Sequence, residues 1–327
     1  MCIRDRPKIT SIVAERDSID GFSNYLFDDL NVKTNFRVGK SDRFYLSYYS
    51  GRDDFENEKL RPEFRDSFPT QADTLLIGTF FDSNRDSLKW GNQLVSLRWN
   101  HLFGDKIFAN TTAYLSQYKF TSSEVFRSVG IYDNGRKDLV FSERVFNSEI
   151  RDLGLRSDVE YLYSDRLNFK FGVGTIHHSF RPGSFENGTD LKDVPIPVLA
   201  LDTVNLSVEN QLNIEEINSN EVFTYIESGI SLNRKFYLTV GLHAKFWKFE
   251  DFQDLSVLPR FNLDYKLNDN FSLSATYLEI AQHLHLLTKS DIGLPGDIWV
   301  PASEKVRPET ATPVSYTHLT LPTICSV

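Results

Sequence analysis

Two stretches between Val257 and Leu287 alternate strictly between apolar and polar side chains. A β-strand directs successive side chains to opposite faces, so this spacing gives each stretch one apolar and one polar face. The intervening Asn268-Asp269-Asn270 is typical of a tight turn, because Asn and Asp tolerate left-handed backbone. The segment therefore predicts a long antiparallel hairpin whose apolar face carries Phe261, Leu263, Tyr265, Leu267, Phe271, Leu273, Ala275 and Tyr277.

The same unit recurs along the chain. Similar alternation flanks short turn sequences at Gly39–Asp42, Gly104–Asp105, Ser164–Arg166 and Asn233–Arg234. This indicates about five hairpins and about ten strands of roughly 12–16 residues. We expect an all-β protein, an antiparallel up-and-down meander that forms an open fragment of a large transmembrane β-barrel.

The connections between these hairpins are long and polar, apart from a short one near 250–256. They are expected as loops at Arg52–Lys89, Thr121–Val145, Arg181–Asn220 and Leu287–Pro308. Tight turns at one end and long loops at the other are typical of outer-membrane barrels, in which turns are periplasmic and loops extracellular. Aromatic residues gather near both strand ends, as in the girdles of such barrels. No run of 18 apolar residues predicts a transmembrane helix.

Both ends of the chain resemble translated sequencing adapters. Met1–Arg6 and the segment beginning Val314-Ser315-Tyr316-Thr317-His318 match the two strands of such an adapter almost word for word. The only Met and both Cys lie in these flanks. We expect residues 1–6 and 314–327 to be adapter artefacts, and residues 7–313 to be an internal piece of a longer protein.

Two stretches resemble a known family. Gln282-His283-Leu284-His285-Leu286-Leu287, followed by Leu294-Pro295-Gly296-Asp297-Ile298-Trp299-Val300-Pro301, is similar to the barrel of TonB-dependent outer-membrane receptors of the Bacteroidetes type. The segment from Trp90 to Thr112 is also similar. Pro308-Glu309 departs from the Pro-Gln that closes the family pattern. Residues 7–313 are thus expected to be part of such a receptor's barrel domain.

The resemblance implies a barrel of about 22 strands, plugged by an N-terminal domain, in the outer membrane of a Gram-negative bacterium. It implies active uptake of a scarce or large nutrient, such as a siderophore, a cobalamin, an oligosaccharide or a peptide. The implied partners are outer-membrane lipid and the TonB-ExbB-ExbD energy-coupling system, which acts through the plug; a surface lipoprotein is a further candidate. The resemblance does not choose the ligand.

Sites for other chemistry are weakly indicated. His177 and His178 are adjacent on a strand and should face opposite sides, whereas His283 and His285 share a face but are expected as polar strand-end residues. Gly172 and Gly174 are expected to face a crowded lumen. Catalytic motifs are missing, so we expect no enzyme, no cofactor and no metal site. The net charge of −9 argues against nucleic acid as a partner.

Two other functions remain open. A passive porin-like channel shares the barrel, the turns and the aromatic girdles, and differs by having no plug domain. A soluble β-rich surface adhesin would hide its aromatic face against a second sheet.

Two specific expectations follow for the barrel. One concerns its faces: apolar Phe36, Leu97, Leu155, Phe169, Leu238, Leu242, Leu263 and Leu273 should share the outer face, and Arg37, Arg98, Arg156, Lys170, Asn262 and Asp264 the inner face. The other concerns the ligand, which should be met by the long loops and upper wall. Aromatic and Arg side chains dominate binding hot spots, so the candidate contacts are Tyr132, Arg136, Arg181, Phe185 and Trp299.

Overall fold

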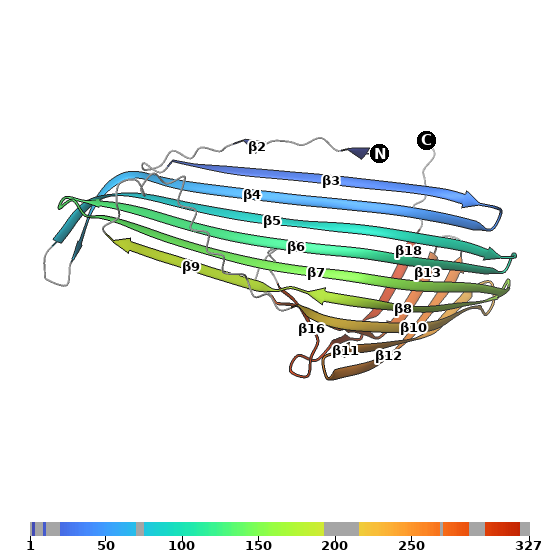
Figure 1. Ribbon diagram of the computed structural model, residues 1–327. Coiled ribbons are helices and arrows are strands. Elements are labelled where there is room, and N and C mark those ends of the chain that lie inside the picture. The colour runs from blue at the N-terminus through green and yellow to red at the C-terminus, as the bar shows by residue number, and fades with distance from the viewer. Residues whose placement is uncertain are drawn as a thin grey trace, which may run out of the picture.

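The computed structural model describes residues 2–3, 9–10, 20–69, 75–192, 216–268, 271–287 and 298–320, nearly all of them in strands (Figure 1). The elements are β1 (Cys2–Ile3), β2 (Ile9–Thr10), β3 (Asp20–Val38), β4 (Asp42–Pro69), β5 (Leu75–Phe103), β6 (Ile107–Tyr132), β7 (Lys137–Ser164), β8 (Leu167–Phe180), β9 (Gly183–Lys192), β10 (Ile217–Ser231), β11 (Phe236–Phe249), β12 (Phe252–Asn268), β13 (Phe271–Leu278), β14 (Ile280–Gln282), β15 (Leu284–Leu287), β16 (Ile298–Pro301), β17 (Glu309–Ala311) and β18 (Val314–Thr320).

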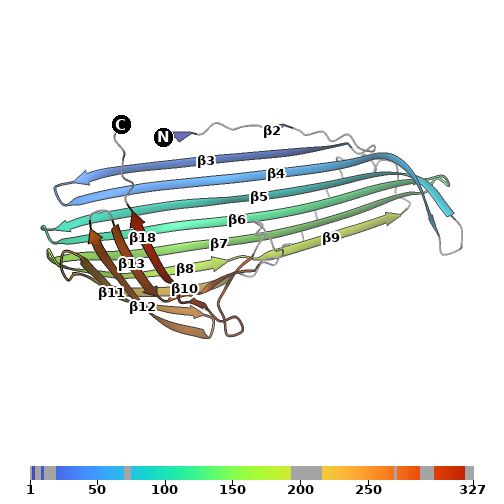
Figure 2. The same ribbon diagram turned by 180° about the vertical axis from the view of Figure 1, so that it is seen from behind.

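Most strands form one antiparallel sheet of 14 strands in the order β1-β3-β4-β5-β6-β7-β8-β10-β11-β12-β13-β18. From β3 to β13 this is the expected meander of successive hairpins. β2 pairs with β3, and β9 continues along β7 where β8 ends. Figure 2 shows β11, β12, β13 and β18 crossing in front of the long strands, so the sheet curls back on itself. The predicted fold class is confirmed.

The short turns lie where the sequence predicts them. The structure places turns at residues 39–41, 104–106, 165–166 and 233–235 between paired strands. Gly39 and Gly104 have positive φ values of 66° and 67°, a conformation that favours glycine in a tight turn. The turn expected at Asn268-Asp269-Asn270 includes two residues outside the described part, but Asn268 pairs with Phe271 across it.

The long connections at the other end are largely strands, which corrects the prediction of loops. β4 and β5 pair as far as Pro69 and Leu75, and β6 and β7 pair as far as Ile131 and Lys137. These strands have 28, 29, 26 and 28 residues, about twice the expected length. Within Arg181–Asn220, β9 pairs with β7. The charged residues in these stretches thus lie in paired strands and not in loops.

The strand register confirms the two predicted faces. Residues that pair across antiparallel strands point to the same side of a sheet. Phe36 pairs with Phe44, and Phe44 pairs with Trp99; Leu97, two residues from Trp99 on β5, faces the same side. From Leu97 an unbroken series of pairs crosses the sheet through Ala113, Leu155, Thr175, Val222, Phe246 and Leu255. Every second residue along these strands faces the same side, and these residues include Phe169, Leu238, Leu242, Leu263 and Leu273. The six predicted polar residues lie on the opposite face.

A band of apolar side chains, called here the apolar belt, covers the outer face beside the short turns. On β11 it runs from Phe236 to Phe246, and on β12 from Leu255 to Tyr265; neither strand places a charged residue in the belt. Each run matches the 9–11 residues that a tilted transmembrane strand needs. Leu242 and Leu255 are 46% and 66% exposed, so no described element covers them. Among the described residues, no helix is long and apolar enough to cross a membrane.

The chain leaves the sheet after Leu278, where the sequence predicts a strand continuing to Leu287. β14 pairs with β17, and β15 pairs with β16. We call β15 and β16 together the inner hairpin. β18, which pairs with β13, lies in the segment expected to be adapter-encoded, and that assignment stays a prediction.

Candidate functional site

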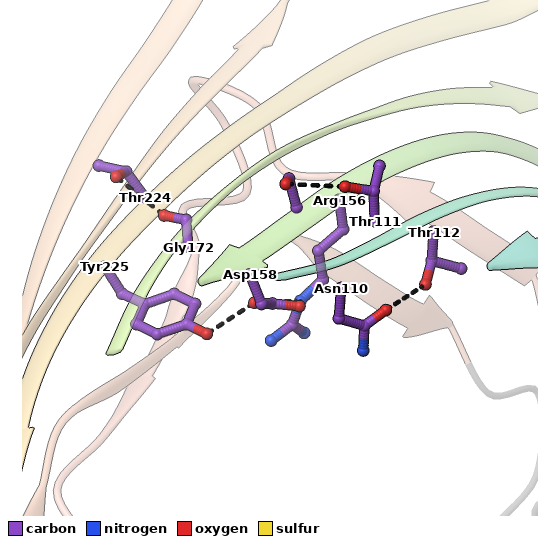
Figure 3. Close-up of polar contacts among 9 residues, drawn as sticks. Asn110, Thr111, Thr112, Arg156, Asp158, Gly172, Thr224 and Tyr225 are labelled. Atoms are coloured by element: carbon purple, nitrogen blue, oxygen red, sulfur yellow. Dashed lines mark hydrogen bonds and ion pairs between the residues drawn. The ribbon is translucent and has the colours of Figure 1, made fainter. Parts of the chain in front are cut away.

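The inner face of the sheet carries an ordered polar network. Arg156 on β7 donates from Nε to both carboxylate oxygens of Asp158, at 2.9 and 2.8 Å. Tyr225 on β10 donates its hydroxyl to Asp158 at 2.6 Å, and the Arg156 guanidinium lies 5.8 Å from the Tyr225 ring centre. Figure 3 shows these three side chains together on one side of the strands. The arrangement presents a fixed polar surface to the space inside the curl.

The network extends across the next strands. The rings of Tyr225 and His243 stack with centres 4.7 Å apart. His243 Nε2 lies 2.9 Å from Glu227 Oε1, and Arg260 lies 3.7 Å from the same oxygen. The strands β7, β10, β11 and β12, of which the first two are separated by β8, thus supply one set of alternating charges. Such a surface suits contact with polar solutes or with another polar protein part.

Glycines make room for aromatic side chains on the inner face of the sheet. An added Cβ at Gly172 would lie 1.9 Å from the Tyr225 ring, and one at Gly174 would lie 2.4 Å from the Phe223 ring. Both glycines are on β8, in pairing contact with β10, and face inward. This confirms the expectation that they face a crowded interior.

Replacing Gly172 with alanine should therefore lower the free energy of unfolding by about 1–3 kcal/mol, as overpacking does. The ring of Tyr225 has to move, which breaks its bond to Asp158 and its stacking on His243. Urea titration of Gly172→Ala, Tyr225→Ala and the double variant measures the coupling. In the Tyr225→Ala background the glycine substitution should cost almost nothing. An undiminished cost there would show that Tyr225 is not the obstacle.

A buried aromatic cluster anchors the chain beyond β13 to this wall. Trp247 on β11 is fully buried, and its ring stacks on that of His283 at 5.3 Å and meets that of His178 at 5.6 Å. The Trp247 indole donates to the carbonyl of Ala302 at 3.1 Å. Each His bonds a carboxylate of the sheet: His178 to Asp152 at 2.7 Å and His283 to Asp254 at 2.9 Å. The cluster fixes the inner hairpin inside the curl.

A cavity of about 650 Å³, called here the wall cavity, lies between the inner hairpin and the sheet. Its volume is within the range of small-molecule sites. The hairpin contributes apolar side chains, and β4 to β7 contribute hydroxyl, amide and carboxylate groups. The lining side chains include Trp299, Leu284 and Leu286 from the hairpin, with Tyr49, Asn92, Leu94, Ser116, Tyr118, Ile150 and Asp152 from the sheet. Such a mixed lining suits a ligand with both apolar and polar parts.

The predicted ligand contacts do not form one site. Tyr132 and Arg136 meet at the far end of β6 and β7, where the guanidinium lies 5.4 Å from the ring centre and also binds Asp138. Trp299 lines the wall cavity, beside Ile150. Tyr118 pairs with Ile150, so it marks the level of the wall cavity on β6. Ile131, the neighbour of Tyr132, lies about 40 Å farther along the same strand.

Arg181 lies near the level of the wall cavity. Its backbone N–H donates to the carbonyl of Glu149 at 2.9 Å, next to the cavity residue Ile150. Its side chain bonds Glu216 at 2.8 Å, and this bond holds the pKa of the Glu216 carboxyl below its ordinary value. For Phe185 the structure describes the backbone, which pairs with Val145 on β7, and its side chain lies outside the described part. Of the predicted ligand contacts, Arg181 and Trp299 thus lie at about the same height along the strands.

The four histidines singled out in the sequence each contact a polar side chain of the protein. His177 faces outward beside Asn220, whereas His178 faces inward and is buried, as their adjacency predicts. His283 and His285 are buried, contrary to the expectation of strand-end residues at an interface; they contact Asp254 and Glu309. Across the described ranges, no group of three or more His, Cys, Asp or Glu side chains is arranged to hold a metal ion.

Comparison with known proteins gives a likeness only among solved structures. No family model matches the sequence, and no curated protein matches it. Three receptor structures resemble the chain. They are the ferric preacinetobactin receptor BauA of Acinetobacter baumannii (8% identity, TM-score 0.43, covering 91% of this chain and 50% of BauA), the siderophore receptor PiuA of the same species (13%, 0.44, 94% and 55%) and the siderophore receptor PirA of Pseudomonas aeruginosa (14%, 0.37, 94% and 54%). The chain spans about half the length of these proteins.

Proposed function

We propose that the chain forms part of the wall of an outer-membrane receptor that actively takes up a scarce or large nutrient, and that it is not an enzyme. The observation that carries this proposal is the division of one curled sheet into two faces. The outer face bears the apolar belt, whose length suits the membrane core, and the inner face bears the network around Arg156 and Asp158. Such a sheet suits lipid on one side and a polar lumen on the other.

The inner hairpin favours a receptor over an open channel. It lies on the inner wall and is held there by the buried Trp247 cluster. A passive channel needs a free lumen, whereas a receptor needs a surface that retains its ligand. The wall cavity beside Trp299 supplies such a surface, with a volume of about 650 Å³.

The energy source and the ligand class come from the family resemblance of the segments around Gln282–Leu287 and 294–301. That resemblance implies coupling to TonB-ExbB-ExbD through a plug domain, in the outer membrane of a Gram-negative bacterium. The ligand would be a siderophore, a cobalamin, an oligosaccharide or a peptide, and a surface lipoprotein would be a further partner. The porin-like channel is the second candidate, because it would share the belt and the polar inner wall.

Uptake measurements separate these functions. The full-length gene that contains this segment is expressed in a strain lacking its own receptors, with and without TonB. Accumulation of radiolabelled ferric siderophores, cyanocobalamin, oligosaccharides and peptides is then followed. At least one probe should accumulate, and removal of TonB should abolish that accumulation. Accumulation that persists without TonB would favour the passive channel, and no accumulation of any probe would count against uptake.

Trp299→Ala tests the wall cavity in the same assay. Loss of a central aromatic contact should lower uptake about tenfold or more at limiting ligand. Leu287→Ala is the matched control, because Leu287 is on the same hairpin, is 49% exposed and does not line the cavity. Heat-modifiable migration on a gel confirms that both variants assemble. Equal uptake by the two variants would remove the wall cavity from ligand recognition.

A further inference from the structure

The wall cavity holds one fixed charge. Among the described residues that line it, Asp152 alone has a charged side chain. The polar groups beside it are neutral hydroxyls and amides, such as those of Ser116, Tyr118 and Asn92, and the inner hairpin adds apolar and aromatic side chains. A ligand in the cavity therefore meets a single negative charge in surroundings that are otherwise neutral.

The strand register places Asp152 at one end of the cavity floor. This floor is a row of successive cross-strand partners on β4, β5, β6 and β7, namely Tyr49, Leu94, Ser116 and Asp152. Such partners point to the same side of a sheet, here the inner one. Leu284, Leu286 and Trp299 of the inner hairpin line the same cavity. The carboxylate therefore shares one enclosed space with apolar and aromatic side chains.

The buried neighbour of Asp152 leaves this charge in place. His178 Nδ1 lies 2.7 Å from Asp152 Oδ1, while His178 Nε2 is buried and has no hydrogen-bond partner in the described part of the chain. A proton on Nε2 would be a buried donor without an acceptor, which is costly. The imidazole is therefore best satisfied as a neutral ring that donates from Nδ1. The second oxygen of Asp152 meets the Ser116 hydroxyl at 3.5 Å, a long bond that leaves the carboxylate able to accept from a ligand.

The other inner-face charges near the cavity offset one another. On the side of β7 to β11 the cations are paired, Arg156 with Asp158 and Lys245 with Glu221. On β3 and β4, Asp29 and Asp53 lie one and two rows from the floor in the direction away from the short turns. Lys33 and Arg98, on β3 and β5, lie one and two rows from it toward the turns. The charge that a ligand meets inside the cavity is therefore that of Asp152.

We propose that the wall cavity selects a ligand that carries one cationic group, an ammonium or a guanidinium, beside apolar groups, with Asp152 as its counter-ion. The proposal rests on the proposed function and narrows its ligand: a short peptide with one basic side chain fits, whereas an anionic chelate does not. The cation donates to the Asp152 carboxylate, a bond that is stronger than one between neutral groups. The faces of Tyr118 and Trp299 attract the same cation. Leu284 and Leu286 receive the apolar groups of the ligand.

The test measures binding and not uptake. The full-length protein in non-ionic micelles is titrated in a calorimeter with three end-blocked tripeptides: leucine-lysine-leucine, the same peptide with an acetylated lysine, and leucine-glutamate-leucine. The lysine peptide should bind about tenfold more tightly than the acetylated one, and the glutamate peptide most weakly. Asp152→Asn should weaken binding of the lysine peptide about tenfold and leave that of the acetylated peptide unchanged. Asn92→Lys puts a cation into the lining without touching the Asp152–His178 bond, and should make the glutamate peptide the tightest.

Controls separate the cavity from general effects of charge. Asp86→Asn removes the same charge from the inner face about 25 Å farther along β5 than Leu94, and should leave the preference unchanged. Limited proteolysis between residues 279 and 303 checks that the inner hairpin stays in place in Asp152→Asn; if it does not, Asn92→Lys decides. Equal binding of the lysine and acetylated peptides, an equal loss in Asp86→Asn, or an unchanged order of the peptides in Asn92→Lys would overturn the proposal. A protein that prefers the lysine peptide but accumulates no probe counts only against the proposed uptake, and accumulation without this preference counts only against the ligand assignment.

Discussion

Replacement of Trp247 by alanine is expected to lower the free energy of unfolding by about 3–5 kcal/mol, the range for removing a large buried aromatic side chain. Trp247 is fully buried between two imidazole rings and donates to the Ala302 carbonyl, so its loss leaves a cavity and an unpaired acceptor. The inner hairpin should then detach from the wall. Urea titration measures the stability, and limited proteolysis between residues 279 and 303 measures the release.

A second substitution separates the two contributions of this side chain. Trp247→Phe keeps an aromatic ring against His178 and His283 but removes the indole N–H that binds Ala302. Its cost should be smaller, about 1–3 kcal/mol, the cost of leaving a buried group unpaired. Protease resistance of the hairpin in Trp247→Ala, equal to that of the unsubstituted protein, would show that the cluster does not hold it.

The two faces of the sheet were predictable from the sequence because their cause is local. Outward-facing and inward-facing side chains alternate along a strand with a period of two. The apolar side chains of Leu238, Val240 and Leu242 therefore indicate which face they occupy without knowledge of any partner strand. The tight turns were predictable for the same reason, since Gly39 and Gly104 adopt conformations that few other residues tolerate. The order of the strands then follows from hairpins joined in series.

The upper strands were not predictable, because they carry no such alternation. Beyond the apolar belt both faces of β4 and β5 carry polar residues among scattered apolar ones; Glu56 and Asn57, for example, are neighbours on opposite faces. Polar residues without periodicity are typical of loops, so the sequence indicates loops there. The strands are held instead by backbone pairing with their neighbours, which continues for 26 residue pairs between β4 and β5 and depends little on side-chain type.

The inner hairpin and its cluster depend on contacts between distant segments. Trp247 meets His178 and His283, and no local pattern joins these three positions. A weak signal is present: Ala281, His283 and His285 alternate with Gln282 and Leu284, and the structure buries the first three. The sequence alone does not tell which surface covers them.

The ligand candidates were chosen as aromatic and Arg residues expected in loops, and the structure separates them. Tyr132 and Arg136 meet because only three residues, in a tight turn, separate them. Trp299 lies about 40 Å lower, because the chain beyond β13 folds inward at that level. The cavity residues that the sequence missed, such as Tyr49 and Tyr118, are ordinary strand residues on the inner face and become a group only through the register.

Leu242→Arg should lower the free energy of folding into lipid vesicles by about 2–4 kcal/mol, the cost of a cation at mid-depth on the lipid face of a barrel. Leu242 lies within the apolar belt, between the cross-strand partners Ile226 and Pro259, and is 46% exposed on the face that we assign to lipid. A cation there loses its hydration without gaining a partner. Reversible urea titration in vesicles measures the effect.

Thr239→Arg is the matched control, because it introduces the same cation on the same strand but on the inner face, opposite Asn262. Water and polar neighbours remain available there, so its cost should stay below about 1 kcal/mol. Leu242→Phe tests size alone and should be nearly neutral on a lipid-facing surface. Equal costs for the two arginine variants would mean that both faces meet the same solvent. The barrel interpretation would then fail, and the soluble alternative would take its place.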